Sequence, residues 1–481
     1  MSTAHRIKWK KSDHAKAIVA FTVNALLLIA FMLVALIFKV NGIEPALAFA
    51  KSNVKMFGFI FLAVILLFVA TYAFYYSQYR DLMHKTRNIY MLSGVLIISI
   101  IASYAFGKIS VYLRPFALCA LLALLLSDKR SAIFLNCIYS ILLLLLDVLT
   151  GNSVSNIIFS LVVGFISGAM AVFMVDGEGS RVKVLFMGAL ISIPAIFCTL
   201  VVELSTNYIA LLYSLLFALG SGVLADALMM IILPFFELVF GALTNFRLAE
   251  LTDHKAKLIK ELSQKAPGTF SHTIILAMLA EACGNAIGVN PLLARACAYY
   301  HDVGKLKQPG YFTENQTGKN PHDELMPELS TDIIRAHARD GAALIRKRRL
   351  PEALASAAEQ HHGTLPIRYF YMKASKFTDG ALSLENFCYY GPKPQTKVNA
   401  IIMICDACEA KVRTISNRTH ENVDKAVKEI IEERMEMEQF TECDITLREL
   451  GIIRNTITNT LSGVYHERVK YPKLKTGGKR G

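Results

Sequence analysis

Long apolar runs fill the first half of the chain, from about residue 16 to residue 232, with only short polar breaks between them. A helix needs about 20 apolar residues to cross the hydrocarbon core of a bilayer. By this criterion the runs predict eight spanning helices, at 17–38, 56–76, 90–107, 111–126, 131–149, 157–175, 184–203 and 208–230. The fourth is short and carries Arg114 near one end, which leaves a count of seven open.

The basic residues indicate which ends of these helices face the cytoplasm. Lys and Arg precede the first span and occur in the breaks at 77–89, 127–130 and 176–183, whereas the alternate breaks at 150–156 and 204–207 carry neither. Because cytoplasmic loops of membrane proteins are enriched in Lys and Arg, the alternation predicts a cytoplasmic amino terminus. Eight spans then return the chain to the cytoplasm, and we expect the second half to lie there.

The second half has a mixed, charged composition in which Ala, Leu, Ile, Glu and Lys dominate, and it contains no long alternating run typical of strands. An amphipathic helical segment leads into it and breaks at Pro267-Gly268. The predicted fold class is therefore all-α. It comprises a polytopic membrane domain over 1–232, a juxtamembrane helical linker over 233–265, a cytosolic helical domain over 266–466 and a basic tail over 467–481.

Composition excludes several classes of protein. The net charge of +13 is explained by basic cytoplasmic loops, so we expect no nucleic-acid polymer as a partner. The nine cysteines are scattered and do not form a disulfide framework. Cys405 and Cys408 have C-x-x-C spacing without a second pair, and we interpret both as packing residues. Glu203 and Asp226 lie near span ends, where they can reach the interface, and so do not indicate a transporter.

Histidines and aspartates recur through the second half in the order H…HD…H…HH…D, each in a helical context. Singly, each has an ordinary interpretation as a surface or hydrogen-bonded core residue. Together they resemble a metal site, because imidazole and carboxylate suit Mn, Fe, Zn and similar cations, and metal would compensate polar groups among apolar neighbours. Seven ligands suit two ions, which together promote in-line attack on phosphorus. The seven are His272, His301, Asp302, His337, His361, His362 and Asp406.

This order resembles that of the HD-domain phosphohydrolases. Local stretches extend the resemblance to the bacterial seven-transmembrane HD proteins, which include cyclic-di-AMP phosphodiesterases. The stretches are APGTFSHT (266–273), YYHDVGKL (299–306), YFTENQ (311–316), NPHD (320–323), HARDGAALI (337–345), EQHHGT (359–364) and YYGPKPQTK (389–397). The resemblance is strong over about 230 residues and looser over the membrane half.

The resemblance implies two divalent transition metal ions, Mn or Fe. One would be held by His272, His301, Asp302 and Asp406, and the other by Asp302, His337, His361 and His362. Asp302 and Lys305 would be catalytic, with Lys305 as a point charge facing the phosphate. Expected substrate contacts are Lys305, Glu314, Asn315, Gln316, Asn320, His322 and Tyr369. The implied protein is a multi-pass enzyme of the bacterial cell membrane that hydrolyses cyclic di-AMP to linear pApA.

Two features depart from the family pattern. Typical members carry a large extracellular domain after the first span, whereas here that interval is only 39–55. The signature of the related cyclic-di-GMP hydrolases is also missing, because His362 is followed by Gly363-Thr364-Leu365-Pro366. Hydrolysis of cyclic di-GMP or ppGpp, or a non-catalytic nucleotide receptor in the membrane, stays open as an alternative. The oligomeric state is open as well, a homodimer included.

Overall fold

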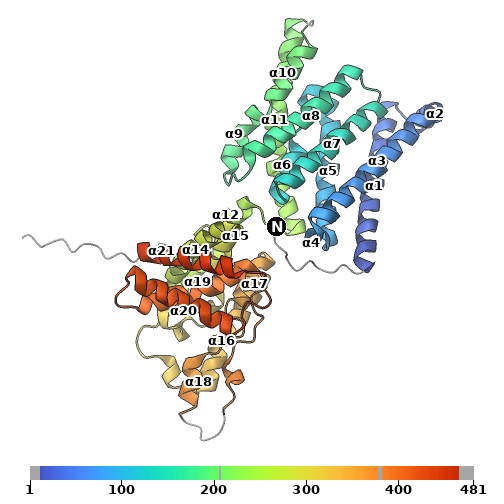
Figure 1. Cartoon of the computed structure of the whole chain (residues 1–481). Helices are drawn as coiled ribbons and strands as arrows, with labels where there is room; N and C mark the ends of the chain where they lie inside the picture. Colours follow the sequence, from blue (N-terminus) through green and yellow to red (C-terminus); the bar gives the residue numbers. More distant parts are fainter. Residues whose placement is uncertain (1–10, 205–206, 377–381, 465–481) are drawn as a thin grey trace, which may run out of the picture. The chain divides into compact units, whose positions relative to one another are not determined.

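The computed structural model describes residues 11–204, 207–376 and 382–464. The chain divides into two compact units, Met1–Arg247 and Leu248–Gly481, each built from helices (Figure 1). Across these described ranges there is no strand, and the one isolated β-bridge joins Pro366 to Cys388. The predicted all-α fold class is confirmed.

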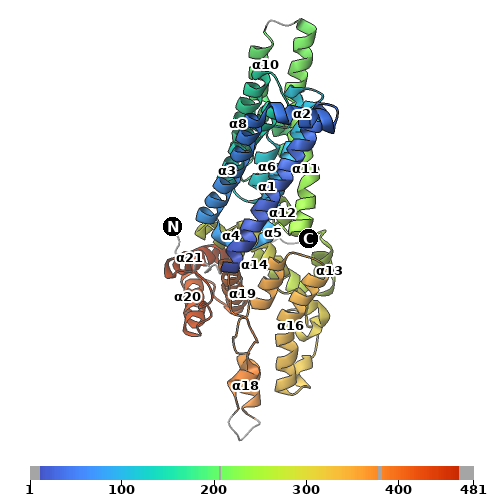
Figure 2. The ribbon, with the colours of Figure 1, turned by 90° about the vertical axis from the view of Figure 1, so that its right-hand side faces the viewer.

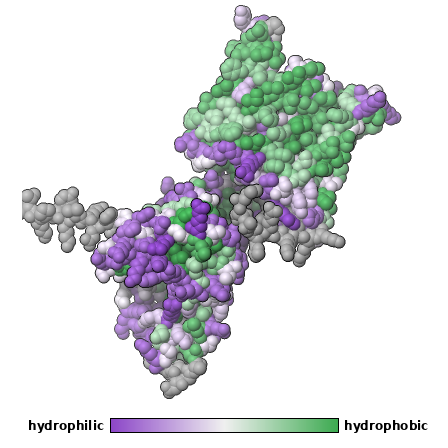
Figure 3. All heavy atoms as spheres, viewed as in Figure 1, coloured by the Kyte–Doolittle hydropathy of each residue, from purple (hydrophilic) through white to green (hydrophobic). Residues whose placement is uncertain are grey.

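Unit 1 is a bundle of long apolar helices. Its elements are α1 (Lys11–Lys39), α2 (Ile43–Ser52), α3 (Val54–Gln78), α4 (Arg80–Met83), α5 (Thr86–Gly107), η1 (Val111–Leu113), α6 (Leu118–Leu126), α7 (Lys129–Leu149), α8 (Val154–Val175), α9 (Arg181–Ile191), α10 (Ile193–Val202) and α11 (Tyr208–Phe240). The long helices run side by side (Figure 2), and apolar residues dominate the visible face of the unit (Figure 3). Such a surface suits contact with lipid.

Seven of the predicted spans coincide with helices long and apolar enough to cross a bilayer. The predicted span at 111–126 differs, because it consists of the short turn η1 and the helix α6 of nine residues. A helix of this length rises only about 14 Å, roughly half of a bilayer core. Among the described residues one further helix, α14 in unit 2, also meets the length and hydropathy criterion.

The segment at 111–126 nevertheless runs from one end of the bundle to the other. At its start, Tyr112 donates a hydrogen bond to Glu203, which follows α10. At its end, Asp128 accepts one from Tyr79, which follows α3. The irregular part is tolerated because residues 114–124 are buried within the unit, and non-helical backbone at membrane depth requires such cover.

A buried ion pair anchors this segment. The Arg114 guanidinium donates to both oxygens of Asp147 in α7, at 2.6 and 2.7 Å, and to the Ser160 hydroxyl at 2.8 Å. Asn152 donates to the same carboxylate at 2.7 Å. Both charged side chains are almost wholly buried. The sequence analysis did not identify Asp147. The negative charge of this buried carboxylate is compensated by the hydrogen bonds from Arg114 and Asn152.

The two acids expected at span ends behave differently from each other. Glu203 is bound by Tyr112, as described above. Asp226 does not reach an interface, because its side chain is fully buried where α11 crosses α9. A Cβ atom at Gly188 would lie 2.6 Å from the Asp226 carboxylate, so only a glycine there permits this crossing. The expectation for Asp226 was therefore wrong.

Unit 2 contains shorter helices and several single turns. Its elements are α12 (Asn245–Leu251), α13 (Lys257–Lys265), α14 (Pro267–Ile287), α15 (Pro291–Tyr300), η2 (Val303–Lys307), η3 (Pro309–Tyr311), η4 (Thr313–Asn315), η5 (Pro321–Asp323), α16 (Pro327–Lys347), α17 (Glu352–Gln360), α18 (Arg368–Ala374), η6 (Leu384–Phe387), α19 (Lys397–Thr414), α20 (His420–Glu436) and α21 (Leu447–Val464). The linker predicted over 233–265 is not one helix: it comprises the end of α11, then α12 and α13.

The centre of unit 2 is α19, which packs against α14, α15, α17 and α20. Its residues Ile401, Ile402 and Ile404 have no exposed surface. Cys405 and Cys408 are buried in the same helix and unpaired, which agrees with their interpretation as packing residues. Prolines at the first turn start α14, α15 and α16, and Gly288 in the left-handed conformation ends α14.

Replacing Asp147 by Asn should destabilise unit 1, because the Arg114 guanidinium would stay buried without its counter-charge. We expect a loss of about 3–5 kcal/mol in the free energy of unfolding, measured as a lower melting midpoint of the detergent-solubilised chain. Lys129→Gln is the matched control, since the Lys129–Asp176 pair is exposed and should contribute about 1 kcal/mol or less. Replacing both Arg114 and Asp147 by Leu should recover much of the loss, and equal effects of Asp147→Asn and the control would contradict this account.

Candidate metal centre

Unit 2 brings the seven predicted metal ligands together from five helical regions. His272 lies in the first turns of α14, and His301 and Asp302 follow directly after α15. His337 lies in the middle of α16, His361 and His362 follow α17, and Asp406 lies in the middle of α19. Four of the seven positions fall just beyond helix ends, where the chain turns and successive side chains point in different directions.

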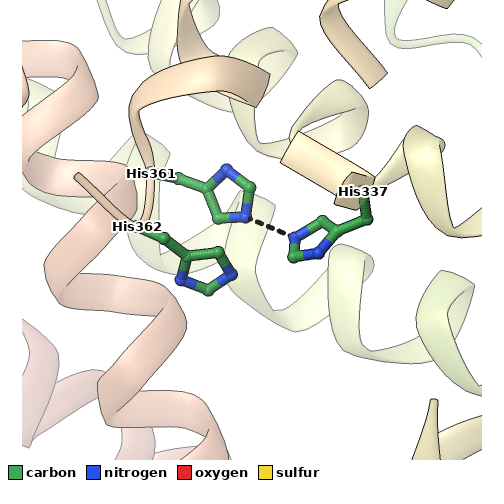
Figure 4. Close-up of side chains that lie close together, drawn as sticks. All are labelled: His337, His361 and His362. Atoms are coloured by element: carbon green, nitrogen blue, oxygen red, sulfur yellow. Dashed lines mark hydrogen bonds between the residues drawn. The ribbon is translucent and has the colours of Figure 1, made fainter. Parts of the chain in front are cut away.

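The ligand atoms form two clusters, which a third group of His301, Asp302 and His361 links. The first joins His272, His301 and Asp406, whose candidate ligand atoms all lie within 4.8 Å of one another. Within it, His272 Nε2 is 3.1 Å from Asp406 Oδ1. The second joins His337, His361 and His362, which point toward one another (Figure 4). There the Nε2 atoms of His337 and His361 are 3.2 Å apart.

Asp302 lies between the two clusters and presents one oxygen to each. Its Oδ2 atom is 3.3 Å from His301 Nε2 in the first cluster. Its Oδ1 atom is 3.3 Å from His337 Nε2 and 3.6 Å from His361 Nε2 in the second. A carboxylate in this position can contribute a ligand atom to two ions at once.

The hydrogen bonds of the histidines show that their inward nitrogens are prepared to bind metal. The Nδ1 atoms of His301, His337 and His361 lie 2.6, 2.5 and 2.8 Å from main-chain carbonyls three residues earlier. Since a carbonyl only accepts, these Nδ1 atoms carry a proton, and in the neutral ring each Nε2 then offers its lone pair. His301 Nε2 and Asp302 Oδ1 are buried and have no hydrogen-bond partner among the residues that the structure describes. Such orphaned atoms fit a bound cation.

The electrostatics of the cluster keep the ligands in their metal-binding forms. Burial, together with the neighbouring His361, lowers the pKa of His337 to about 4 and lowers that of His362 well below its usual value. Burial by itself raises the pKa of Asp302, but Lys305 and His301 outweigh it and hold that pKa well below the usual range. At neutral pH the two imidazoles are therefore neutral and the carboxylate is ionised.

Lys305 and the segment after it lie against the centre. The Lys305 ammonium is 2.7 Å from Asp302 Oδ2 and 2.8 Å from Glu314 Oε1. Burial lowers the pKa of this lysine, but the two carboxylates outweigh it and raise the pKa above its usual value, so the charge is retained. Glu314 also accepts from the Thr269 hydroxyl, and Asn315 accepts from the main-chain nitrogens of Gly268 and Thr269. Both residues thus fix the start of α14.

The other expected substrate contacts lie farther along the chain. Gln316 donates to Asn320, which in turn caps the short turn that contains His322. His322 is buried, with its Nε2 3.0 Å from the Tyr311 carbonyl. Tyr369 is largely exposed on α18, which lies at one end of unit 2 (Figures 1 and 2). Within the described residues, no hydrogen bond, ion pair or ring contact joins any of these four to the seven ligands.

Two residues that the sequence analysis did not assign are in contact with ligands. Tyr389 stacks on His362, with ring centroids 4.2 Å apart. Glu409 lies one turn after Asp406 in α19, and its Oε2 atom is 2.5 Å from His272 Nδ1. The spacing of Asp406 and Glu409 places both carboxylates on one helix face, which was a signal available in the sequence. For Tyr389 the only signal was its place in the family-like stretch at 389–397.

Comparisons with known proteins agree with both halves of the chain. Residues 54–244 match the family described as 7TM receptor with intracellular HD hydrolase, and residues 269–411 match the HD domain. The cyclic-di-AMP phosphodiesterase PgpH of Bacillus subtilis (strain 168) is 37% identical over 430 residues, which cover 86% of this chain and 60% of that protein. PgpH of Listeria monocytogenes is 36% identical over 437 residues, 88% of this chain and 60% of that protein.

The chain thus spans about 60% of the length of these curated relatives. Among solved structures, the HD domain of L. monocytogenes PgpH in complex with cyclic-di-AMP is 47% identical. The match covers 44% of this chain and 99% of that one, with a TM-score of 0.43.

Replacing Gly304 by Ala should disrupt the centre, because η2 and α16 touch through their main chains at this point. A Cβ atom on Gly304 would lie 1.9 Å from the His337 carbonyl oxygen, so α16 would have to move away from Asp302. We expect a loss of about 1–3 kcal/mol in stability and a lower content of bound metal, measured by thermal unfolding and elemental analysis.

Gly310→Ala is the matched control, because nothing lies within 4 Å of a Cβ atom there. It should change stability by less than about 0.5 kcal/mol and leave the metal content intact. A Gly304→Ala variant that kept wild-type stability and metal content would show that the close approach is not required.

Proposed function

We propose that this chain, which matches the family of 7TM receptors with an intracellular HD hydrolase over residues 54–244 and the HD domain over 269–411, is a membrane-anchored, metal-dependent phosphodiesterase that hydrolyses cyclic di-AMP to linear pApA in the cytoplasm. The observation that carries the proposal is the pair of imidazole and carboxylate clusters that share Asp302. The membrane anchor is unit 1, whose match to a seven-transmembrane family and long apolar helices identify a multi-pass membrane protein.

The clusters fit two divalent transition metal ions, Mn or Fe, because neutral imidazoles and carboxylates suit both metals. His272, His301, Asp302 and Asp406 would hold one ion, and Asp302, His337, His361 and His362 the other. When bound, such a pair supplies the Lewis acidity and positive charge that phosphodiester hydrolysis requires.

Lys305 would stabilise the charge that develops on the phosphate. Its ammonium is held between Asp302 and Glu314 and lies on the ring of Phe312, with 5.0 Å from the nitrogen to the ring centroid. A restrained, buried cation costs little reorganisation when negative charge grows beside it. Six further substrate contacts stay predictions: Glu314, Asn315, Gln316, Asn320, His322 and Tyr369.

The choice of cyclic di-AMP rests on the relatives and on the sequence around the site. The two curated relatives carry this activity in their names and are 36–37% identical to the chain. The Gly363-Thr364 continuation after His362 differs from the signature of cyclic-di-GMP hydrolases. Placement of unit 2 in the cytoplasm is supported by the basic breaks at 77–89, 127–130 and 176–183. A homodimer stays a prediction.

The detergent-solubilised full chain, loaded with manganese, should cleave cyclic di-AMP and leave cyclic di-GMP and ppGpp largely intact, as measured by chromatography of the products. Asp302→Ala should abolish turnover and lower metal content, because it removes the ligand shared by both clusters. Asp444→Ala, at an exposed position in the same unit, is the control and should keep both. Cleavage of ppGpp alone would overturn the substrate, and full activity of Asp302→Ala would overturn the assigned centre.

Replacing Lys305 by Gln should lower kcat by about 100- to 1000-fold while both metal ions stay bound, since the lysine contributes charge rather than a ligand atom. Lys307→Gln is the control two residues away: its ammonium is exposed and pairs with Asp340 at 2.9 Å. Steady-state kinetics and elemental analysis test both variants. If Lys305→Gln turned over substrate as fast as Lys307→Gln does, Lys305 would not act on the phosphate.

A further inference from the structure

The histidines of the centre differ in the hydrogen-bond partner of Nδ1, the ring nitrogen that faces away from the centre. His301, His337 and His361 each pair Nδ1 with a main-chain carbonyl. His272 instead pairs Nδ1 with a carboxylate, Glu409 Oε2, at 2.5 Å. A carbonyl is a neutral acceptor, whereas a carboxylate brings a full negative charge to the far side of the ring. The two clusters are therefore not equivalent, although the sequence presents them as a similar set of ligands.

Glu409 is itself fixed in place. The residue has no exposed surface. Its second oxygen, Oε1, accepts from Arg413 Nη2 at 2.6 Å and from Arg413 Nε at 3.1 Å. Arg413 lies one turn further along α19, so this single helix carries the ligand Asp406, the carboxylate that orients His272 and the cation that holds this carboxylate. A buried charge without such a partner would be costly, and Arg413 offsets that cost.

We propose that Glu409 is a positioning residue that makes the His272–Asp406 position the tighter of the two metal positions. Its hydrogen bond sets the tautomer and ring angle of His272 and raises the basicity of the inward Nε2 atom. The charges favour the same position: Asp406 lies 3.1 Å from His272 Nε2, and Glu409 adds a second carboxylate behind that ring. At the His337–His361–His362 position the shared Asp302 lies 3.3 Å from His337, and Asp406 comes only within 3.9 Å of His362. The proposal rests on the metal centre of the proposed function and does not depend on the nucleotide.

The test compares Glu409→Gln with the wild type in the metal-free, detergent-solubilised full chain. Glutamine has nearly the same shape, and its amide oxygen can still accept from His272. Its NH2 group then faces Arg413 in place of an acceptor, and the negative charge is gone. Mn²⁺ is titrated into each protein, and electron paramagnetic resonance of the free ion gives the two dissociation constants. We expect one of them, the tighter in the wild type, to rise about 10- to 100-fold in Glu409→Gln while the other stays unchanged.

Two further variants assign the effect. Glu429→Gln is the matched control, because Glu429 also pairs with a cation of α19, Lys411, at 2.6 Å, but on the exposed side; both constants should stay at wild-type values. His337→Ala removes a ligand of the other position, and the single strong site that remains should weaken by the same factor when Glu409→Gln is added. Arg413→Gln should weaken that site in the same direction, because it releases the carboxylate that holds His272.

Unchanged constants in Glu409→Gln would overturn the proposal. Equal weakening of both sites, accompanied by a lower melting midpoint, would also overturn it, because that is the result expected if Glu409 only held α14 against α19. The outcome is separable from the proposed activity, since the titration contains no nucleotide. A wild-type chain that bound two Mn²⁺ ions unequally but cleaved no cyclic di-AMP would count against the substrate and leave the order of the metal positions standing.

Discussion

The cost of removing charge from water governs the arrangement of unit 2. Asp302 is 2% exposed, and a buried carboxylate is tolerated only when it is paired or bound to metal. Lys305 supplies the charge partner, and main-chain carbonyls near helix ends hold the imidazoles. The atoms left without a partner, His301 Nε2 and Asp302 Oδ1, are those that a cation would complete. Fold and chemistry are linked here, because the same helix ends that bring the ligands together also satisfy their outer atoms.

Unit 1 obeys the same rule by other means. The break in regular helix at 111–126 brings Arg114 into the bundle, and Asp147 receives it with two hydrogen bonds. Both side chains are almost wholly buried, so each charge is tolerated there because the other charge neutralises it. Asp226 shows the opposite arrangement: at the glycine crossing of α9 and α11 both of its carboxylate oxygens are buried, and within the described part of the chain neither has a hydrogen-bond partner.

Much of this could be predicted from the sequence, because it depends on local pattern. Seven of the spans follow from runs of apolar residues, and the seven ligands follow from residue type, order and a family resemblance. What could not be predicted depends on contacts between distant segments. The irregular course of 111–126 requires the buried pair of Arg114 and Asp147, which are 33 residues apart. Glu409 acts on His272, 137 residues away, and Asn315 caps α14 from 46 or 47 residues downstream.

The contact between Gly304 and α16 has a consequence for both clusters of the metal centre. The main chains of η2 and α16 meet at Gly304 and Gly341. They lie so close together that Gly304 could not carry a side chain. Asp302, which both clusters share, and His337 of the second cluster lie within a turn of this contact. The approach of His337 to Asp302 is therefore limited by contact between two main chains, which a Cβ atom on Gly304 would force apart. A side chain at Gly304 would consequently disturb both clusters at once, because the carboxylate beside this contact belongs to both.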